Sequence, residues 1–148
     1  MLPLMTTVDR ARPADGDAIE RLLRENQLPL DGLRDHLATA VVARQDGNVV
    51  GSAALETYAD GVLLRSVAVS PALHARGIGG ELTAAAIQLA RDLRAPAIYL
   101  LTTTAERYFP KFGFERIQRS DVPPSVLQSI EFTSVCCSSA AVMRKRLD

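Results

Sequence analysis

The residues with the clearest chemical potential lie in a glycine-rich segment, Leu64–Leu82, which contains Gly77, Gly79 and Gly80. The segment begins with an apolar run typical of a strand and ends with the helical spacing of apolar residues. The pattern therefore predicts a strand, a turn and a helix in this order. Glycines permit a sharp turn and a close approach of the backbone to a ligand. The unpaired amide groups at the start of a helix attract anions, and the helix dipole adds to this attraction. The segment therefore predicts a cradle for an anion such as a phosphate.

Two common phosphate-binding patterns fit this segment poorly. A P-loop needs GxxxxGK[ST], and the segment contains no lysine. A dinucleotide-binding fold needs GxGxxG directly after the first strand of a βαβ unit, whereas several strand-like segments precede these glycines. A turn that only connects two elements would have a similar composition, so the residues alone leave the ligand open.

The remaining chain alternates between strand-like and helical patterns, which predicts an α/β (α+β) fold. A turn at residues 13–17 leads into a helical pattern that continues to about residue 25. Helical spacing also covers residues 31–37, 80–93, 105–112 and 126–130. Strand-like patterns cover residues 6–12, 39–44, 48–57, 62–69, 97–101, 114–119 and 140–147. Asp46-Gly47 predicts a tight hairpin, and Gly113 predicts a helix end. The helix between 62–69 and 97–101 forms a crossover, which allows those two strands to be parallel.

Size and composition predict a single globular domain spanning residues 1–148. The chain is 47% apolar and 23% charged, and its length is typical of one domain. The net charge of +0 argues against nucleic-acid binding. No run reaches the ~20 apolar residues of a membrane span and no signal peptide is evident, so we expect a soluble cytoplasmic protein.

The two cysteines, Cys136 and Cys137, are adjacent in the sequence. Neighbouring cysteines rarely bridge, and no metal-ligand spacing surrounds this pair. We interpret them as free thiols of a reducing compartment and expect no metal site. Capture of a metal or an arsenical by the pair is the alternative.

Two motifs in the right order resemble the GCN5-related N-acetyltransferase (GNAT) family. The first is Val67-Ala-Val-Ser-Pro71 followed by His74-Ala-Arg-Gly-Ile-Gly79, which is similar to the family signature Gln/Arg-x-x-Gly-x-Gly/Ala. The second is similar to Asn-x-x-Ala-x-x-x-Tyr-x-x-x-Gly-Phe, with Thr102 in place of the Asn and Phe109 in place of the Tyr. The resemblance follows the order of elements along essentially the whole chain.

The resemblance implies a central mixed, mostly antiparallel sheet of about 6–7 strands with about four helices. It also implies acetyl-CoA as cofactor, with the strand backbone pairing with the pantetheine and the turn binding the pyrophosphate. The cofactor-binding residues carried over in this way are Val67, Ala68, Val69, His74, Ala75, Arg76, Gly77, Ile78, Gly79, Gly80, Thr102 and Phe109.

The family's reaction is a direct attack of an amine on a thioester, which needs a proton acceptor and an acid for the departing thiolate. Glu56 is the best candidate for the acceptor, because it lies on the strand before the motif strand, and Glu131 is a weaker one. Phe109 replaces the tyrosine that often serves as the acid, so we assign this role to the neighbouring Tyr108, with Thr102 or water as alternatives. A core position for Tyr108 remains the competing interpretation.

Three segments carry a narrower resemblance: Leu100–Glu106, Gly113–Arg119 and Glu131–Met143. They resemble the acetyltransferase domains of bacterial N-acetylglutamate synthases and the small acetyltransferases associated with arsenic resistance. Both imply a glutamate-like or arsenical amino-acid substrate, whose carboxylate needs a cation. Arg65 is the preferred cation, and Arg44 and Arg119 are the lesser candidates. Acetylation of a peptide or protein amine, or a coenzyme A-binding module without catalysis, are the competing functions. A homodimer through the C-terminal strands is compatible with the family.

Overall fold

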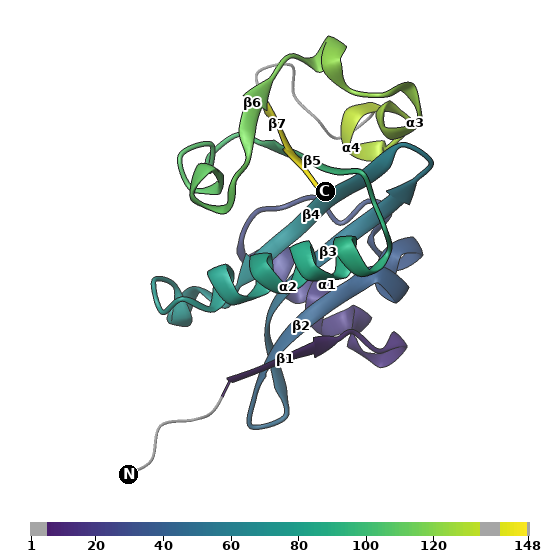
Figure 1. The fold of residues 1–148 in the computed structure, drawn as a ribbon. Helices are drawn as coiled ribbons and strands as arrows, with labels where there is room; N and C mark the ends of the chain where they lie inside the picture. The colour runs from purple at the N-terminus through teal and green to yellow at the C-terminus, as the bar shows by residue number, and fades with distance from the viewer. Residues whose placement is uncertain (1–5, 134–139, 148) are drawn as a thin grey trace. The chain divides into compact units, whose positions relative to one another are not determined.

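The computed structural model describes residues 6–133 and 140–147, and these residues contain every element named below. The strands are β1 (Thr6–Arg10), β2 (Ala40–Gln45), β3 (Asn48–Tyr58), β4 (Gly61–Val69), β5 (Ala97–Thr102), β6 (Glu115–Ile117) and β7 (Ala141–Arg146) (Figure 1). The α-helices are α1 (Gly16–Glu25), α2 (Ile78–Asp92), α3 (Pro124–Leu127) and α4 (Ile130–Thr133). Short 3₁₀ helices cover Pro13–Asp15, Leu33–Thr39, Pro71–Leu73, Phe109–Phe112 and Arg119–Asp121.

The described strands form one mixed sheet in the order β1-β2-β3-β4-β5-β7-β6. The pairs β1/β2, β2/β3, β5/β7 and β6/β7 are antiparallel. β4 and β5 are parallel, with Val62 opposite Ile98 and Leu64 opposite Leu100. The predicted fold class and the predicted parallel crossover are therefore both confirmed.

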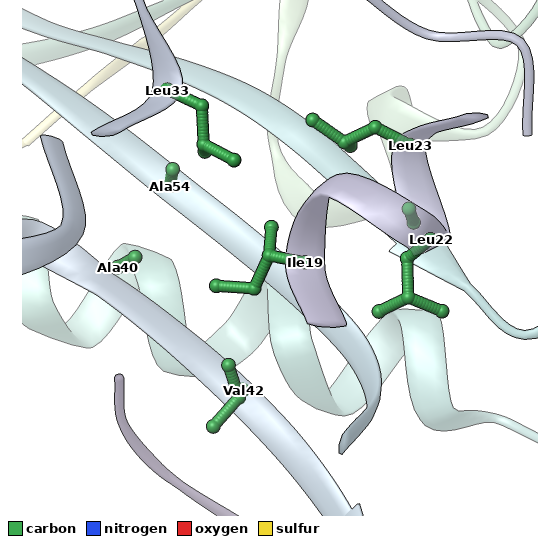
Figure 2. Close-up of a cluster of buried hydrophobic side chains, with 8 residues drawn as sticks. Ile19, Leu22, Leu23, Leu33, Ala40, Val42 and Ala54 are labelled. Atoms are coloured by element: carbon green, nitrogen blue, oxygen red, sulfur yellow. The ribbon is translucent and has the colours of Figure 1, made fainter. Parts of the chain in front are cut away.

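The first of two compact units comprises Met1–Ala54 and Ser66–Ala86. Its core forms because α1 places Ile19, Leu22 and Leu23 on one face, at the spacing of a helix that packs by one side. These residues pack with Leu33 and with small or branched side chains of the strands (Figure 2). Alanine and valine dominate the strand side of this core, which lets the helix lie close to the strands.

The second compact unit comprises Leu55–Arg65 and Ile87–Asp148. Its core collects buried side chains from strands and from the segment around α3 and α4, namely Leu63, Ala97, Tyr99, Val122, Val126, Phe132 and Val142. β3, β4 and α2 each contribute residues to both units. No helix in the described part of the chain is long and apolar enough to cross a membrane.

Two predicted helices differ from the observed elements. Residues 105–112 form only a turn and the 3₁₀ helix Phe109–Phe112. Pro110 lies in the first turn of this 3₁₀ helix and has no amide hydrogen, so it could not donate a hydrogen bond inside a longer helix that began at residue 105. Gly113 ends this element at φ 93°, as its position predicted. In the 31–37 region a 3₁₀ helix begins after Gly32, whose φ is 78°.

Candidate active site

The glycine-rich turn and the first residues of α2, up to Ala86, lie in the first unit, where the sequence predicts an anion cradle. Ala75 and Gly77 adopt left-handed backbone conformations with φ of 65° and 82°, which reverse the chain before α2 begins at Ile78. The first helical bond of this turn joins the Glu81 amide to the Gly77 carbonyl at 3.1 Å. The amides that precede it have no acceptor within the helix, because no turn lies before them. A Cβ placed on Gly77 would meet no atom within 4 Å, so the backbone here leaves room for a ligand.

The end of β4, just before the turn, has an irregular backbone. Ser66 has φ 58°, an uncommon value for a residue with a side chain, and its carbonyl accepts a 2.8 Å hydrogen bond from the Ser52 hydroxyl. Beyond it Ala68 is buried in the first unit, whereas Val67 and Val69 are partly exposed. This irregularity lies in the strand whose backbone, by the family resemblance, is expected to pair with the pantetheine.

The Val69 carbonyl, at the last residue of β4, receives two side-chain donors. His74 Nε2 lies 2.8 Å from this oxygen, and Asn26 Nδ2 lies 3.1 Å from it. Asn26 also donates to the Leu22 carbonyl at 2.8 Å, and its Oδ1 lies 3.2 Å from His74 Nε2. The two side chains thus connect the end of α1, the end of β4 and the start of the turn.

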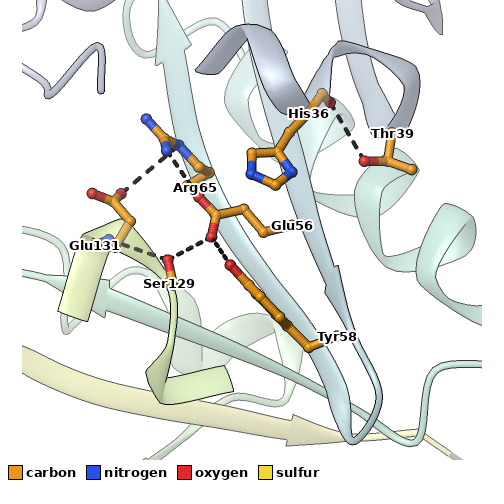
Figure 3. Close-up of polar contacts among 7 residues, drawn as sticks. All are labelled: His36, Thr39, Glu56, Tyr58, Arg65, Ser129 and Glu131. Atoms are coloured by element: carbon orange, nitrogen blue, oxygen red, sulfur yellow. Dashed lines mark hydrogen bonds and ion pairs between the residues drawn. The ribbon is translucent and has the colours of Figure 1, made fainter. Parts of the chain in front are cut away.

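A buried carboxylate, Glu56, is the centre of the second unit's polar cluster (Figure 3). Arg65 Nη1 donates to Glu56 Oε2 at 2.8 Å, and both side chains are almost completely buried. The Tyr58 hydroxyl donates to Glu56 Oε1 at 2.6 Å, and the Ser129 hydroxyl donates to the same oxygen at 2.5 Å. A charge without contact to water needs such partners, and here a cation and two hydroxyl groups supply them.

The cluster also contains a second carboxylate, Glu131, on α4. Its Oε1 lies 3.9 Å from Arg65 Nε, and its backbone amide donates to the Ser129 hydroxyl at 3.1 Å. Ser129 therefore links the start of α4 to Glu56. Burial, followed by the hydrogen bond to Glu56, raises the pKa of Tyr58 to about 12, which keeps this phenol protonated as a donor.

The three candidate arginines have different surroundings. Arg65 pairs with Glu56, as described. Arg44 makes a two-pronged ion pair with Asp15 at 3.0 and 2.6 Å, which lowers the pKa of Asp15. The guanidinium of Arg119 lies over the ring of Phe132 at 5.3 Å. Arg44 thus has a partner inside the first unit, and Arg65 and Arg119 lie in the second unit with α3 and α4.

The second motif lies in a group of aromatic side chains. Phe109 is buried and meets the rings of Tyr108 and Phe114 edge-on, with centroids 5.3 and 5.7 Å apart. Tyr108 is partly exposed, and Lys111 Nζ lies 4.0 Å from the centre of its ring. Tyr108 is therefore less buried than its neighbour Phe109, and its assignment as the acid stays a prediction.

Sequence reasoning missed three residues of these clusters: Asn26, Tyr58 and Ser129. Tyr58 follows Glu56 at the two-residue spacing that puts side chains on the same face of a strand, which could have identified it. Asn26 and Ser129 are separated from their partners by 43 and 73 residues, and no local pattern marks such pairs. Cys136 and Cys137 lie outside the described residues.

Comparisons with known proteins agree with this reading of the two motifs. The model of the acetyltransferase (GNAT) family matches residues 6–114. An amino-acid acetyltransferase of Mycobacterium tuberculosis is 32% identical over 134 residues, which are 83% of this chain and 76% of that protein. An amino-acid acetyltransferase of Neisseria meningitidis is 30% identical over 93 residues, and the matched part is only 21% of its length.

Solved structures give the same family. The N-acetylglutamate synthase of Neisseria gonorrhoeae, complexed with coenzyme A and N-acetyl-glutamate, has a TM-score of 0.83 at 25% identity and covers 99% of this chain. The match covers 36% of that synthase, so this chain spans about a third of its length. A Mycobacterium tuberculosis protein solved with CoA has a TM-score of 0.80 at 28% identity, with 96% of this chain and 99% of that chain covered. The chain belongs to the acetyltransferase (GNAT) family and is an acetyl-CoA-dependent N-acetyltransferase.

Proposed function

We propose that this protein acetylates the amino group of a small, glutamate-like amino acid. The observation that carries the proposal is the buried pair of Glu56 and Arg65, which provides a carboxylate and a guanidinium on neighbouring strands. An amino-acid substrate presents the complementary groups, an amine that must lose a proton and a carboxylate that needs a cation. The relatives named amino-acid acetyltransferases support the same substrate class.

The proposed cofactor site uses the backbone more than side chains. Acetyl-CoA supplies the acetyl group as a thioester, which an unprotonated amine attacks. The turn from His74 to Gly80 would hold the pyrophosphate with its amides, with Ala75, Arg76 and Ile78 contributing backbone, and Val67 to Val69 would pair with the pantetheine amides. Thr102 and Phe109 complete this set, as the family resemblance implies.

The proposed proton acceptor is Glu56, directly or through water. Tyr58 and Ser129 hold Oε1 and Arg65 holds Oε2, so the carboxylate keeps one orientation. Glu131, close to Arg65 on α4, is the second acceptor to test. Tyr108 is proposed to protonate the departing sulfur, with Thr102 or water as alternatives. Arg65 is the proposed partner of the substrate carboxylate, ahead of Arg119 and Arg44.

Thiol release from acetyl-CoA, measured against a panel of amines, tests the proposal. The panel contains glutamate, glutamine and other amino acids, the arsenic and phosphorus analogues of glutamate, polyamines and short peptides. We expect the highest kcat/KM for a glutamate-like amino acid or one of its analogues. A higher kcat/KM for peptides than for amino acids would contradict the proposed substrate class and favour a peptide or protein substrate. Tight coenzyme A binding without turnover of any amine would indicate a binding module.

Three broader features remain predictions from the sequence: a single domain spanning residues 1–148, a cytoplasmic location and a homodimer. Sedimentation equilibrium of the purified chain over a range of concentrations measures the last of these directly.

A further inference from the structure

The backbone of β4 beyond Ser66 presents its polar groups to two opposite sides. The Ser70 amide donates to the Val50 carbonyl of β3 at 2.8 Å. Because the amide and carbonyl of a trans peptide point in opposite directions, the Val69 carbonyl faces away from β3. The Ala68 carbonyl faces β3, since it lies 3.2 Å from the Cβ position of Gly51. The polar backbone groups of Val67 and Val69 therefore share the side opposite β3.

This side of β4 carries no strand pairing at Val67 and Val69 within the described residues. The registered pairs of β4 with β5 end at Leu64. A carbonyl oxygen has two lone pairs, and at Val69 the two donors are His74 Nε2 and Asn26 Nδ2. An amide of a ligand that approaches this side thus finds the Val69 carbonyl already occupied.

We infer that His74 and Asn26 are positioning residues that set the register of the pantetheine chain along β4. Because these two side chains occupy the Val69 carbonyl, the Val67 carbonyl is left as the acceptor for a pantetheine amide. The Val69 amide points to the same side and can donate to a pantetheine carbonyl. If the pantetheine chain bound one position further along β4, its thioester would move away from the position where the amine attacks it. A register slip between two strands misplaces side chains in the same way. The inference rests on the proposed binding of acetyl-CoA to this strand.

His74 acts here through its side chain, in addition to the backbone role that its place in the motif implies. Both of its contacts are to oxygen atoms, and the Val69 carbonyl can only accept, so Nε2 carries the hydrogen. A glutamine at this position also offers an N–H donor at the end of its side chain. His74→Gln therefore keeps the donor, and His74→Leu removes it at similar size.

Calorimetry with two probes tests the inference without requiring catalysis. Coenzyme A carries pantetheine, whereas adenosine 3′-phosphate 5′-diphosphate carries the same nucleotide and a diphosphate without it. We expect His74→Leu and Asn26→Ala to raise the Kd for coenzyme A roughly three- to tenfold, as the loss of one net hydrogen bond predicts. The Kd for the pantetheine-free probe should stay unchanged, and His74→Gln should restore most of the affinity for coenzyme A.

Arg24→Ala, an exposed change in α1 two residues before Asn26, is the matched control, and thermal unfolding verifies that each variant folds. Equal weakening of both probes would mean that His74 acts on the phosphate turn and would overturn the inference. Unchanged binding of both probes would overturn it as well. If the unmodified protein itself fails to bind coenzyme A, the proposed function fails, and the inference fails with it.

Discussion

At the scale of single residues, the most demanding feature is the buried charge of Glu56. Its carboxylate has no exposed surface and depends on Arg65, Tyr58 and Ser129. Removing one partner of a buried ion pair leaves an uncompensated charge, whereas replacing both by apolar groups is often tolerated. Stability and catalysis are therefore separable here, because only catalysis requires the charges themselves.

Replacing Arg65 by methionine should destabilise the protein by about 3–5 kcal/mol, because Glu56 loses its buried cation. The double variant Arg65→Met/Glu56→Leu should recover a large part of this loss but remain inactive. Urea unfolding of both single variants and the double variant gives the coupling energy. Equal and additive losses would contradict an energetic link between the two side chains.

Replacing Tyr58 by phenylalanine should change the alkaline stability of the protein. The folded pKa of about 12 exceeds the ordinary value of about 10, so the unfolded chain releases this proton first. The stabilisation is complete below about pH 10 and is lost as the pH rises towards about 12. Urea unfolding between about pH 9 and about pH 11.5 should show a steeper decline in the unmodified protein than in Tyr58→Phe. Parallel declines would contradict the raised pKa.

At the scale of elements, the sequence predicted β4, the glycine-rich turn and α2 well because each depends on local chemistry. Glycine at Gly77 and Gly113 marks left-handed backbone, and apolar spacing marks α2. The left-handed conformation of Ser66 was not predictable, because serine does not require it and its partner Ser52 lies on another strand. Residues 105–112 were predicted to be one helix, whereas only Phe109–Phe112 is helical, with Pro110 in its first turn.

Two glycines with nearly the same backbone provide a matched test of the turn. Gly47, in the β2–β3 hairpin, and Gly77 have φ of 79° and 82°, and a Cβ on either meets no atom within 4 Å. Each change to alanine should cost about 1 kcal/mol of stability from backbone strain. Only Gly77→Ala should also weaken coenzyme A binding, which calorimetry measures. Equal affinity of the two variants would place the pyrophosphate elsewhere.

At the scale of the whole molecule, the predicted cofactor turn and the buried Glu56 cluster belong to different compact units. Segments Ser66–Ala86 and Leu55–Arg65 are nevertheless joined within β4. The net charge of +0 provides no long-range attraction for a polyanion, so affinity for coenzyme A must come from local groups. Because the two sites belong to different units, coenzyme A and the amino-acid product should protect different segments of the chain from hydrogen exchange.

Hydrogen exchange should separate the two ligands. Coenzyme A should slow exchange mainly within Ser66–Ala86, where the backbone amides proposed to bind it lie. The amino-acid product should slow exchange mainly around Arg65 and α4. Mass spectrometry of the protein with each ligand alone measures both patterns, with Gly77→Ala as the control for coenzyme A. Protection of the α4 region by coenzyme A and none within Ser66–Ala86 would contradict the assignment.

The hydrogen bond between Ser129 and Glu56 also has a consequence for how the chain is made. The two residues are 73 positions apart, so Glu56 leaves the ribosome before Ser129 is synthesised. Until then its charge favours water over burial, and closing so long a loop carries an entropic cost. The first unit has its own core and needs none of these later residues. We therefore expect α1 and the strands it packs against to become ordered early in synthesis. Leu55–Arg65 should become ordered only after α4 has been synthesised.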